Sequence, residues 1–155
     1  MTRKVLKHGT WVIVCDGRKA ILLQNEGDAA FPNLRLHEVF ETEIPASRNL
    51  GTAKPGRVFS GKGGRHSAIE PTDLHQQAED AFLAELAQKI EERVRAGAIK
   101  GMILVAPPRA LGALRPHLSE GVRSSLLAEV EKDYVRLPIY EIEEHLKDVL
   151  REATS

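Results

Sequence analysis

The glycine-rich basic stretch at 60–67, Ser-Gly-Lys-Gly-Gly-Arg-His-Ser, has the residue types and spacing best suited to chemistry on a ligand. It lies between Glu43 and Glu70 in a segment with no other carboxylate, although the whole chain of 155 residues has a formal charge of zero. Glycine adopts positive as well as negative φ, so the backbone can lie flat against a ligand there. A local positive charge on a neutral protein predicts a polyanionic partner. A mobile surface hairpin kept soluble by its charge fits the same pattern.

Basic side chains of this segment are candidates for contacts with RNA phosphates, because phosphate oxygens accept hydrogen bonds from cationic donors. The candidates are Arg48, Lys54, Arg57, Lys62, Arg65 and His66. Gly63 and Gly64 would let the backbone approach the RNA closely. The glycine-rich loop 46–69 is too long for a simple connection and has few apolar anchors, so we expect it to be flexible and functional.

The sequence offers little for metal or cofactor chemistry. A two-cation nuclease needs clustered carboxylates, but the first strand is followed only by Asp16, which sits in a turn. The histidines show no paired ligand spacing, and His75 with Glu79 on a helix face predicts a solvated pair. We therefore expect no metal and no cofactor.

Length and composition predict one domain over 1–155, of ordinary size for a single core. Cys15 is the only cysteine, which excludes a disulfide framework and favours a reducing cytoplasm. Its apolar neighbours predict a buried filler rather than a reactive thiolate. No apolar run approaches the ~20 residues of a bilayer span, and the N-terminus lacks the apolar stretch of a signal peptide. We expect a cytoplasmic protein without a membrane span.

Hydrophobic patterning predicts three strands in the first part of the chain. The runs 11–15 and 19–24 should pair antiparallel, because Asp-Gly at 16–17 is a strong hairpin turn. A third strand is expected over 34–44, where Pro45 ends it.

A long helix and an interior strand are expected next. The helix should begin with Thr72 or Asp73 as N-cap and run to about Ala96, closed by Gly97. The uninterrupted apolar run at 102–105 predicts a strand near the centre of a sheet, covered on both faces.

The remaining elements complete a layered fold. A helix is expected over 107–115, and 126–130 either continues a helix from Ser119 or forms the last strand. We favour the strand because 132–133 and the following proline break a longer helix. The closing helix should span 138–151. The order β-β-β-α-β-α-β-α predicts an α/β mixed sheet with helices on its faces, similar to a ribonuclease H-like layer fold.

Four blocks of the sequence resemble the bacterial host attachment protein family, whose members carry the name "protein required for attachment to host cells". The blocks are Trp11–Ala20, Phe82–Ala87, Met102–Arg115, and Glu131–Pro138 with Glu141–Leu146. The most specific part is Ala-Pro-Pro-Arg-x-Leu-Gly-x-Leu-Arg in the third block. That family in turn resembles bacterial relatives of the archaeo-eukaryotic peptide-chain release factors, through the middle domain that carries a Gly-Gly-Gln tip.

The resemblance implies catalytic candidates at Gly63, Gly64 and Arg65, which precede the long helix as the tip would. In release factors the tip enters the peptidyl-transferase centre, and the position after the glycines helps to place the water that cleaves the ester of peptidyl-tRNA. Arg65 replaces the glutamine here, so its backbone N–H remains while the amide side chain is lost. At this length we expect no codon-reading domain and no ordinary stop-codon termination.

Two hypotheses about function follow. The first is an RNA- or ribosome-directed module whose partner is the ribosome or tRNA, with or without residual peptidyl-tRNA ester hydrolysis. The second is a non-catalytic interaction protein that supports attachment of bacteria to host cells through a host-surface or protein partner. The family name records a phenotype and not a chemistry, and the missing export signal favours an indirect origin of that phenotype.

Overall fold

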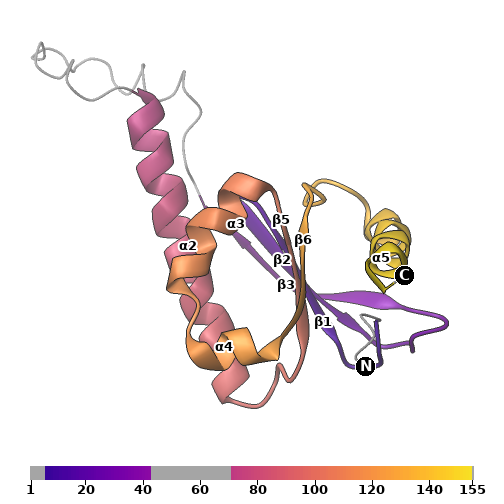
Figure 1. Cartoon of the computed structure of the whole chain (residues 1–155). Helices are drawn as coiled ribbons and strands as arrows, with labels where there is room; N and C mark the ends of the chain where they lie inside the picture. Colours follow the sequence, from indigo (N-terminus) through magenta and orange to yellow (C-terminus); the bar gives the residue numbers. More distant parts are fainter. Residues whose placement is uncertain (1–5, 43–70, 155) are drawn as a thin grey trace, which may run out of the picture.

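The computed structural model of the chain describes residues 6–42 and 71–154. The elements run, in chain order, β1 (Trp11–Cys15), β2 (Lys19–Asn25), β3 (Leu34–Glu41), α2 (Pro71–Arg95), β5 (Met102–Ala106), α3 (Pro108–Leu114), a 3₁₀ turn (Arg115–His117), α4 (Glu120–Ser125), β6 (Leu126–Glu131) and α5 (Ile139–Thr154) (Figure 1). Among these residues, five strands form one mixed sheet in the order β3-β2-β1-β5-β6. The expected α/β layered fold with a mixed sheet is confirmed.

The β1–β2 hairpin forms as its turn chemistry predicts. The strands pair antiparallel from Trp11 opposite Gln24 to Cys15 opposite Ala20. Asp16 closes the turn, because its Oδ1 accepts hydrogen bonds of 2.8 Å from the backbone N–H groups of Arg18 and of the next residue. An aspartate that bonds its own backbone in this way favours a tight turn.

Strand β5 lies inside the sheet, parallel to β1 on one side and to β6 on the other. All five of its residues are buried, which confirms the prediction that 102–105 forms a covered interior strand. The ambiguous segment after Ser119 contains both expected elements: α4, whose N-terminus Ser119 caps by accepting from Val122 N–H at 3.3 Å, and then β6. The preference for a last strand over 126–130 is therefore confirmed.

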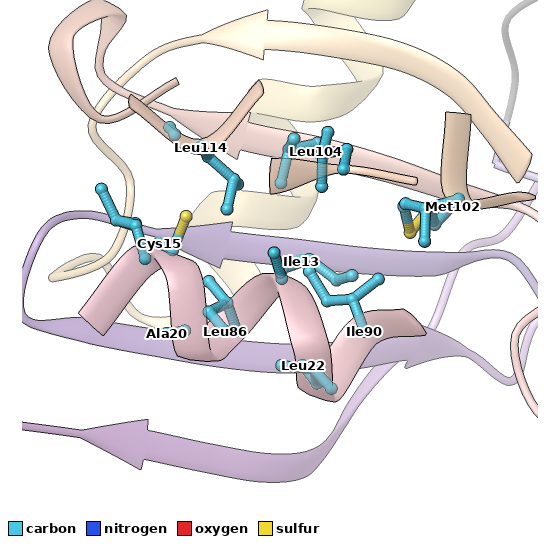
Figure 2. Close-up of a cluster of buried hydrophobic side chains, with 14 of the residues drawn as sticks. Ile13, Cys15, Ala20, Leu22, Leu86, Ile90, Met102, Leu104 and Leu114 are labelled. Carbon is cyan, nitrogen blue, oxygen red and sulfur yellow. The ribbon is translucent and has the colours of Figure 1, made fainter. Parts of the chain in front are cut away.

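Helices cover both faces of the sheet (Figure 1). Because successive strand residues point to opposite faces, Ile13 packs with α2, α3 and α4, while Val12 packs with α5. Figure 2 shows Ile13 and Leu22 of the sheet packed against Leu86 and Ile90 of α2. The three-layer arrangement leaves the strand ends, and the loops that follow them, to form any site.

Cys15 is fully buried in the α2-side core, as its neighbours predict. Burial raises the pKa of its thiol to about 12, with a smaller contribution from the adjacent Asp16. The thiol is therefore neutral at physiological pH and acts as core filler.

The predicted element ends differ from the structure in three places. Helix α2 already begins at Pro71, so Thr72 and Asp73 are inside the helix and the predicted N-cap is wrong, because proline is compatible with the first helical turn. Its far end is as expected, with Gly97 at φ 83°. Strand β3 ends at Glu41 rather than 44, and Thr42 instead donates its N–H to the carbonyl of Arg18 in the hairpin turn.

The end of the chain differs in the same modest way. Helix α5 begins at Ile139, and Pro138 precedes it with a carbonyl that accepts from Glu141 and Ile142. The helix continues to Thr154, beyond the expected end at 151. The glycine-rich loop 46–69 and its expected flexibility lie outside the described residues.

Candidate functional site

The sequence-predicted tip, Gly63, Gly64 and Arg65, lies outside the described residues. The same holds for the other predicted phosphate contacts, which are Arg48, Lys54, Arg57, Lys62 and His66. The structure therefore brings none of them into a described site. It does describe the residues on either side of this segment, Thr42 and Pro71.

Thr42, the last described residue before the undescribed segment, lies at the edge of the sheet at which β1 and β5 end. Thr42 donates to the carbonyl of Arg18 at 2.9 Å, which places the end of β3 beside the β1–β2 turn. The first turns of α2 project past the sheet on that side (Figure 1), and Glu79 in that part of the helix lies against Gly17 of the same turn.

A cavity of about 390 Å³ opens at this edge. We call it the arginine pocket, after the polar side chains that line it: Asp16, Arg18, Gln76, Glu79, Arg109 and Arg136. They come from the β1–β2 turn, from α2, from the start of α3 and from the loop between β6 and α5. Leu83 and Ala110, both buried, supply apolar lining.

Arg109 is held in place from across the pocket. Its guanidinium donates a hydrogen bond to Oε1 of Gln76 on α2. Gln76 in turn donates from Nε2 to Oδ1 of Asp80, one helical turn along, at 3.0 Å. Because Gln76 is neutral, this chain orients the guanidinium without cancelling its charge.

The two carboxylates of the pocket are placed by the hairpin turn. Asp16 uses Oδ1 to accept two backbone N–H groups of the turn. Glu79 lies so close to Gly17 that a Cβ there would stand 2.7 Å from its Cδ. A glycine at 17 therefore lets α2 and the turn approach each other in the pocket wall.

His75 does not form the solvated pair expected with Glu79. Its Nε2 is buried and has no hydrogen-bond partner among the described residues. No cluster of three or more His, Cys, Asp or Glu side chains suited to a metal ion occurs within 6–42 and 71–154. The described residues at this edge present polar and charged side chains to the cavity.

Sequence reasoning missed the arginines of the pocket, because they are far apart in the chain. One signal was available: Arg18 and Arg109 each follow an apolar strand at the end where, in α/β sheets, ligands bind. Arg136 follows β6 in the same way.

Comparison with family models gives the class of this layered α/β domain, which is the release-factor class. The model of the bacterial archaeo-eukaryotic release factor family 12 matches residues 9–146, and the chain belongs to that family. The release-factor half of the resemblance is confirmed at this level, whereas the host-attachment name finds no support in the comparisons.

Comparison with solved structures gives an archaeal translation termination factor, aRF1, at a TM-score of 0.46 and 11% sequence identity. The match covers 93% of this chain and 37% of the archaeal chain, so this chain spans little more than a third of that protein. A search of curated proteins finds no match. Within the described residues, no helix is both long and apolar enough to cross a membrane.

Proposed function

We propose that this protein is a release-factor-like module that binds RNA in the cytoplasm, at the ribosome or on tRNA. The observation that carries the proposal is the match of the family 12 release-factor model to residues 9–146. The two partners named here, the ribosome and tRNA, both display a phosphate backbone to which lysine and arginine side chains bind.

The charge distribution supports an RNA partner. Between Glu43 and Glu70 the sequence has five lysines and arginines and no carboxylate. Thr42, the last described residue before this segment, bonds to Arg18, which lines the arginine pocket. Lysine and arginine contacts to phosphates release counterions, so binding of this kind weakens steeply as salt is added.

Within this proposal, Gly63, Gly64 and Arg65 form the tip that approaches the RNA. The backbone N–H of Arg65 remains available to stabilise charge at a reacting ester, but the glutamine side chain of a Gly-Gly-Gln tip is replaced. RNA binding is therefore the main function in this proposal, and hydrolysis of the peptidyl-tRNA ester is at most a residual activity.

The test of binding uses a double substitution, Lys62→Ala with Arg65→Ala, and electrophoretic or fluorescence binding to tRNA over a range of salt. We expect weaker binding and a log-log salt slope reduced by close to 1 for each lost phosphate contact. The thermal midpoint should not change. An unchanged affinity for tRNA and an unchanged salt slope would show that the tip does not contact the RNA.

The test of chemistry is Arg65→Gln, which restores a Gly-Gly-Gln sequence. Release of labelled peptide from peptidyl-tRNA, measured on ribosomes, should be preserved or raised by this substitution. If neither the wild type nor this variant binds tRNA or ribosomes at low salt, the translational hypothesis is wrong and a protein interaction takes its place.

A further inference from the structure

Three arginines from three separate parts of the chain line the arginine pocket, and none has a carboxylate partner among the described residues. Three other arginines of the domain pair with carboxylates: Arg93 with Glu38, Arg95 with Glu91, and Arg115 with Glu129. Arg35 and Arg123 have no ion pair among the described residues, but neither lines the pocket. Arg18, Arg109 and Arg136 remain unpaired although Asp16 and Glu79 line the same cavity. All three arginines are exposed, and with two carboxylates they leave the lining with an excess of one positive charge, which attracts an anion.

We propose that the arginine pocket is a binding site for the phosphate group of a ribonucleotide, supplied by an RNA strand or by a free nucleotide. Arginine is suited to this because its planar guanidinium presents paired N–H donors that match the oxygens of a phosphate. The inference goes beyond the proposed function, since a site for a free nucleotide would stand even if the protein met no ribosome.

The topology places the pocket where α/β sheets bind ligands. After β5 the chain turns to the sheet face covered by α2, and after β6 it turns to the opposite face, covered by α5. Connections that diverge in this way open a crevice at the carboxyl ends of the strands. Arg109 follows β5 and Arg136 follows β6, so one arginine stands on each of the two diverging connections.

Arg109 is already oriented for an incoming anion. Its hydrogen bond to Gln76, which is itself held by Asp80, uses one of the five N–H donors of the guanidinium. The other donors remain for a ligand. Orienting a side chain before binding lowers the entropy lost on binding, which makes Gln76 a positioning residue.

The net positive charge of the lining favours an anion, but only modestly. Three arginines face two carboxylates, and Oδ1 of Asp16 is engaged by two backbone N–H groups. Glu79 accepts no hydrogen bond from an arginine in the described residues and therefore opposes an anion. The volume of about 390 Å³ falls within the range of small-ligand pockets, and Leu83 and Ala110 offer apolar surface to a sugar or base.

The experiment measures binding of a short fluorescein-labelled oligouridine by anisotropy, with the full chain and single substitutions. Arg109→Gln and Arg136→Gln should each raise the dissociation constant about tenfold and lower the salt slope by about 0.7, the loss of one single-strand phosphate contact. Arg35→Gln is the matched control. Arg35 is also exposed and without an ion pair among the described residues, but it lies on β3 opposite Gln24, at the far edge of the sheet.

Two further variants separate a binding site from general surface charge. Glu79→Gln removes the opposing carboxylate and should tighten binding. Gln76→Ala leaves every charge in place but removes the hydrogen bond that orients Arg109. It should therefore weaken binding while lowering the salt slope by less than the value of about 0.7 expected for one lost phosphate contact. Gln76→Asn keeps a side-chain amide oxygen at this position. If it binds oligouridine more tightly than Gln76→Ala does, residue 76 acts by orienting Arg109 and not merely by supporting the fold.

Titration with uridine monophosphate and with inorganic phosphate identifies the source of the phosphate group. In ¹⁵N-resolved spectra the amides of Gly17 and Arg18 should shift in the wild type and not in Arg109→Gln. If these shifts occur while oligouridine binding is the same in all variants, the pocket takes a free nucleotide.

The proposal is overturned if the substitutions at Arg109 and Arg136 leave oligouridine binding like that of Arg35→Gln and neither phosphate compound shifts the turn amides. If the wild type binds neither ribosomes nor tRNA but its turn amides still shift with a phosphate compound, the proposed function is refuted and the pocket proposal is not. Unchanged ribosome binding in the pocket variants, without amide shifts, would refute the pocket alone.

Discussion

Replacing Asn25 by alanine should strongly destabilise the domain, although Asn25 lies far from the arginine pocket. It is the last residue of β2 and is fully buried. Its Oδ1 accepts from the backbone N–H groups of Gly27 and Asn33 at 2.9 and 2.8 Å, and its Nδ2 donates to the carbonyl of Leu6 at 2.7 Å. One side chain therefore ties the segment before β1 to the connection between β2 and β3.

The magnitude follows from these three short hydrogen bonds. Each contributes about 1 kcal/mol net, so Asn25→Ala should lower the free energy of unfolding by about 3 kcal/mol. Two longer contacts, to the carbonyls of Lys7 and Asp28 at 3.2 and 3.3 Å, add little. For a chain of this size the thermal midpoint should fall by about 9 °C.

Urea unfolding followed by circular dichroism measures the effect, since the change should appear in the midpoint with an unaltered slope. Asn33→Ala is the matched control, because it deletes the same chemical group from an exposed side chain while keeping the backbone N–H that Asn25 binds. If the two variants differ by less than about 1 kcal/mol, the side chain of Asn25 does not hold these segments together.

Three further predictions concern the fold. Gly27→Ala should cost about 1–3 kcal/mol in urea unfolding, because a Cβ at 27 would lie 2.2 Å from the backbone oxygen of Phe31. Leu104→Ala should cost about 2–5 kcal/mol, since Leu104 is fully buried in the interior strand β5. The native Cys15 thiol should resist iodoacetamide, and stability should fall as pH rises from about 9 toward 12, because the folded pKa is raised to about 12 and the unfolded thiol ionises first.

Each of these has a result that would contradict it. Wild-type stability for Gly27→Ala would mean that the carbonyl of Phe31 moves freely. A cost below about 1 kcal/mol for Leu104→Ala would place that side chain outside a packed core. Rapid alkylation of Cys15 at pH 8 would show that the thiol is not buried, and an alkaline loss of stability that is the same in Cys15→Ala would show that this thiol is not its cause.

Most of the fold could be predicted because its strands are read from local pattern. The runs at 11–15 and 102–105 are wholly apolar, as strands covered on both faces must be, and Asp16-Gly17 carries its own turn signal. The start of α2 was misplaced by a residue or two, because Thr72 and Asp73 are good N-caps while Pro71 is equally good inside the first turn.

The arginine pocket could not be predicted by the same means. Arg18, Arg109 and Arg136 meet only because the connections after β1, β5 and β6 end at one edge of the sheet. Which side chains meet at that edge depends on the order of the strands in the sheet and on which face each connecting helix covers. The local hydrophobic pattern of the sequence contains neither kind of information. The close approach of Glu79 to Gly17 is likewise a product of helix placement.

Sedimentation with ribosomes tests the release-factor-like function most directly. Purified protein is mixed with ribosomes at low salt and centrifuged through a sucrose cushion, with and without added salt. We predict that the wild type pellets with ribosomes, that rising salt releases it, and that Lys62→Ala with Arg65→Ala weakens the association. Wild-type protein that stays in the supernatant at low salt, and that also fails to bind tRNA, would contradict an RNA-directed function.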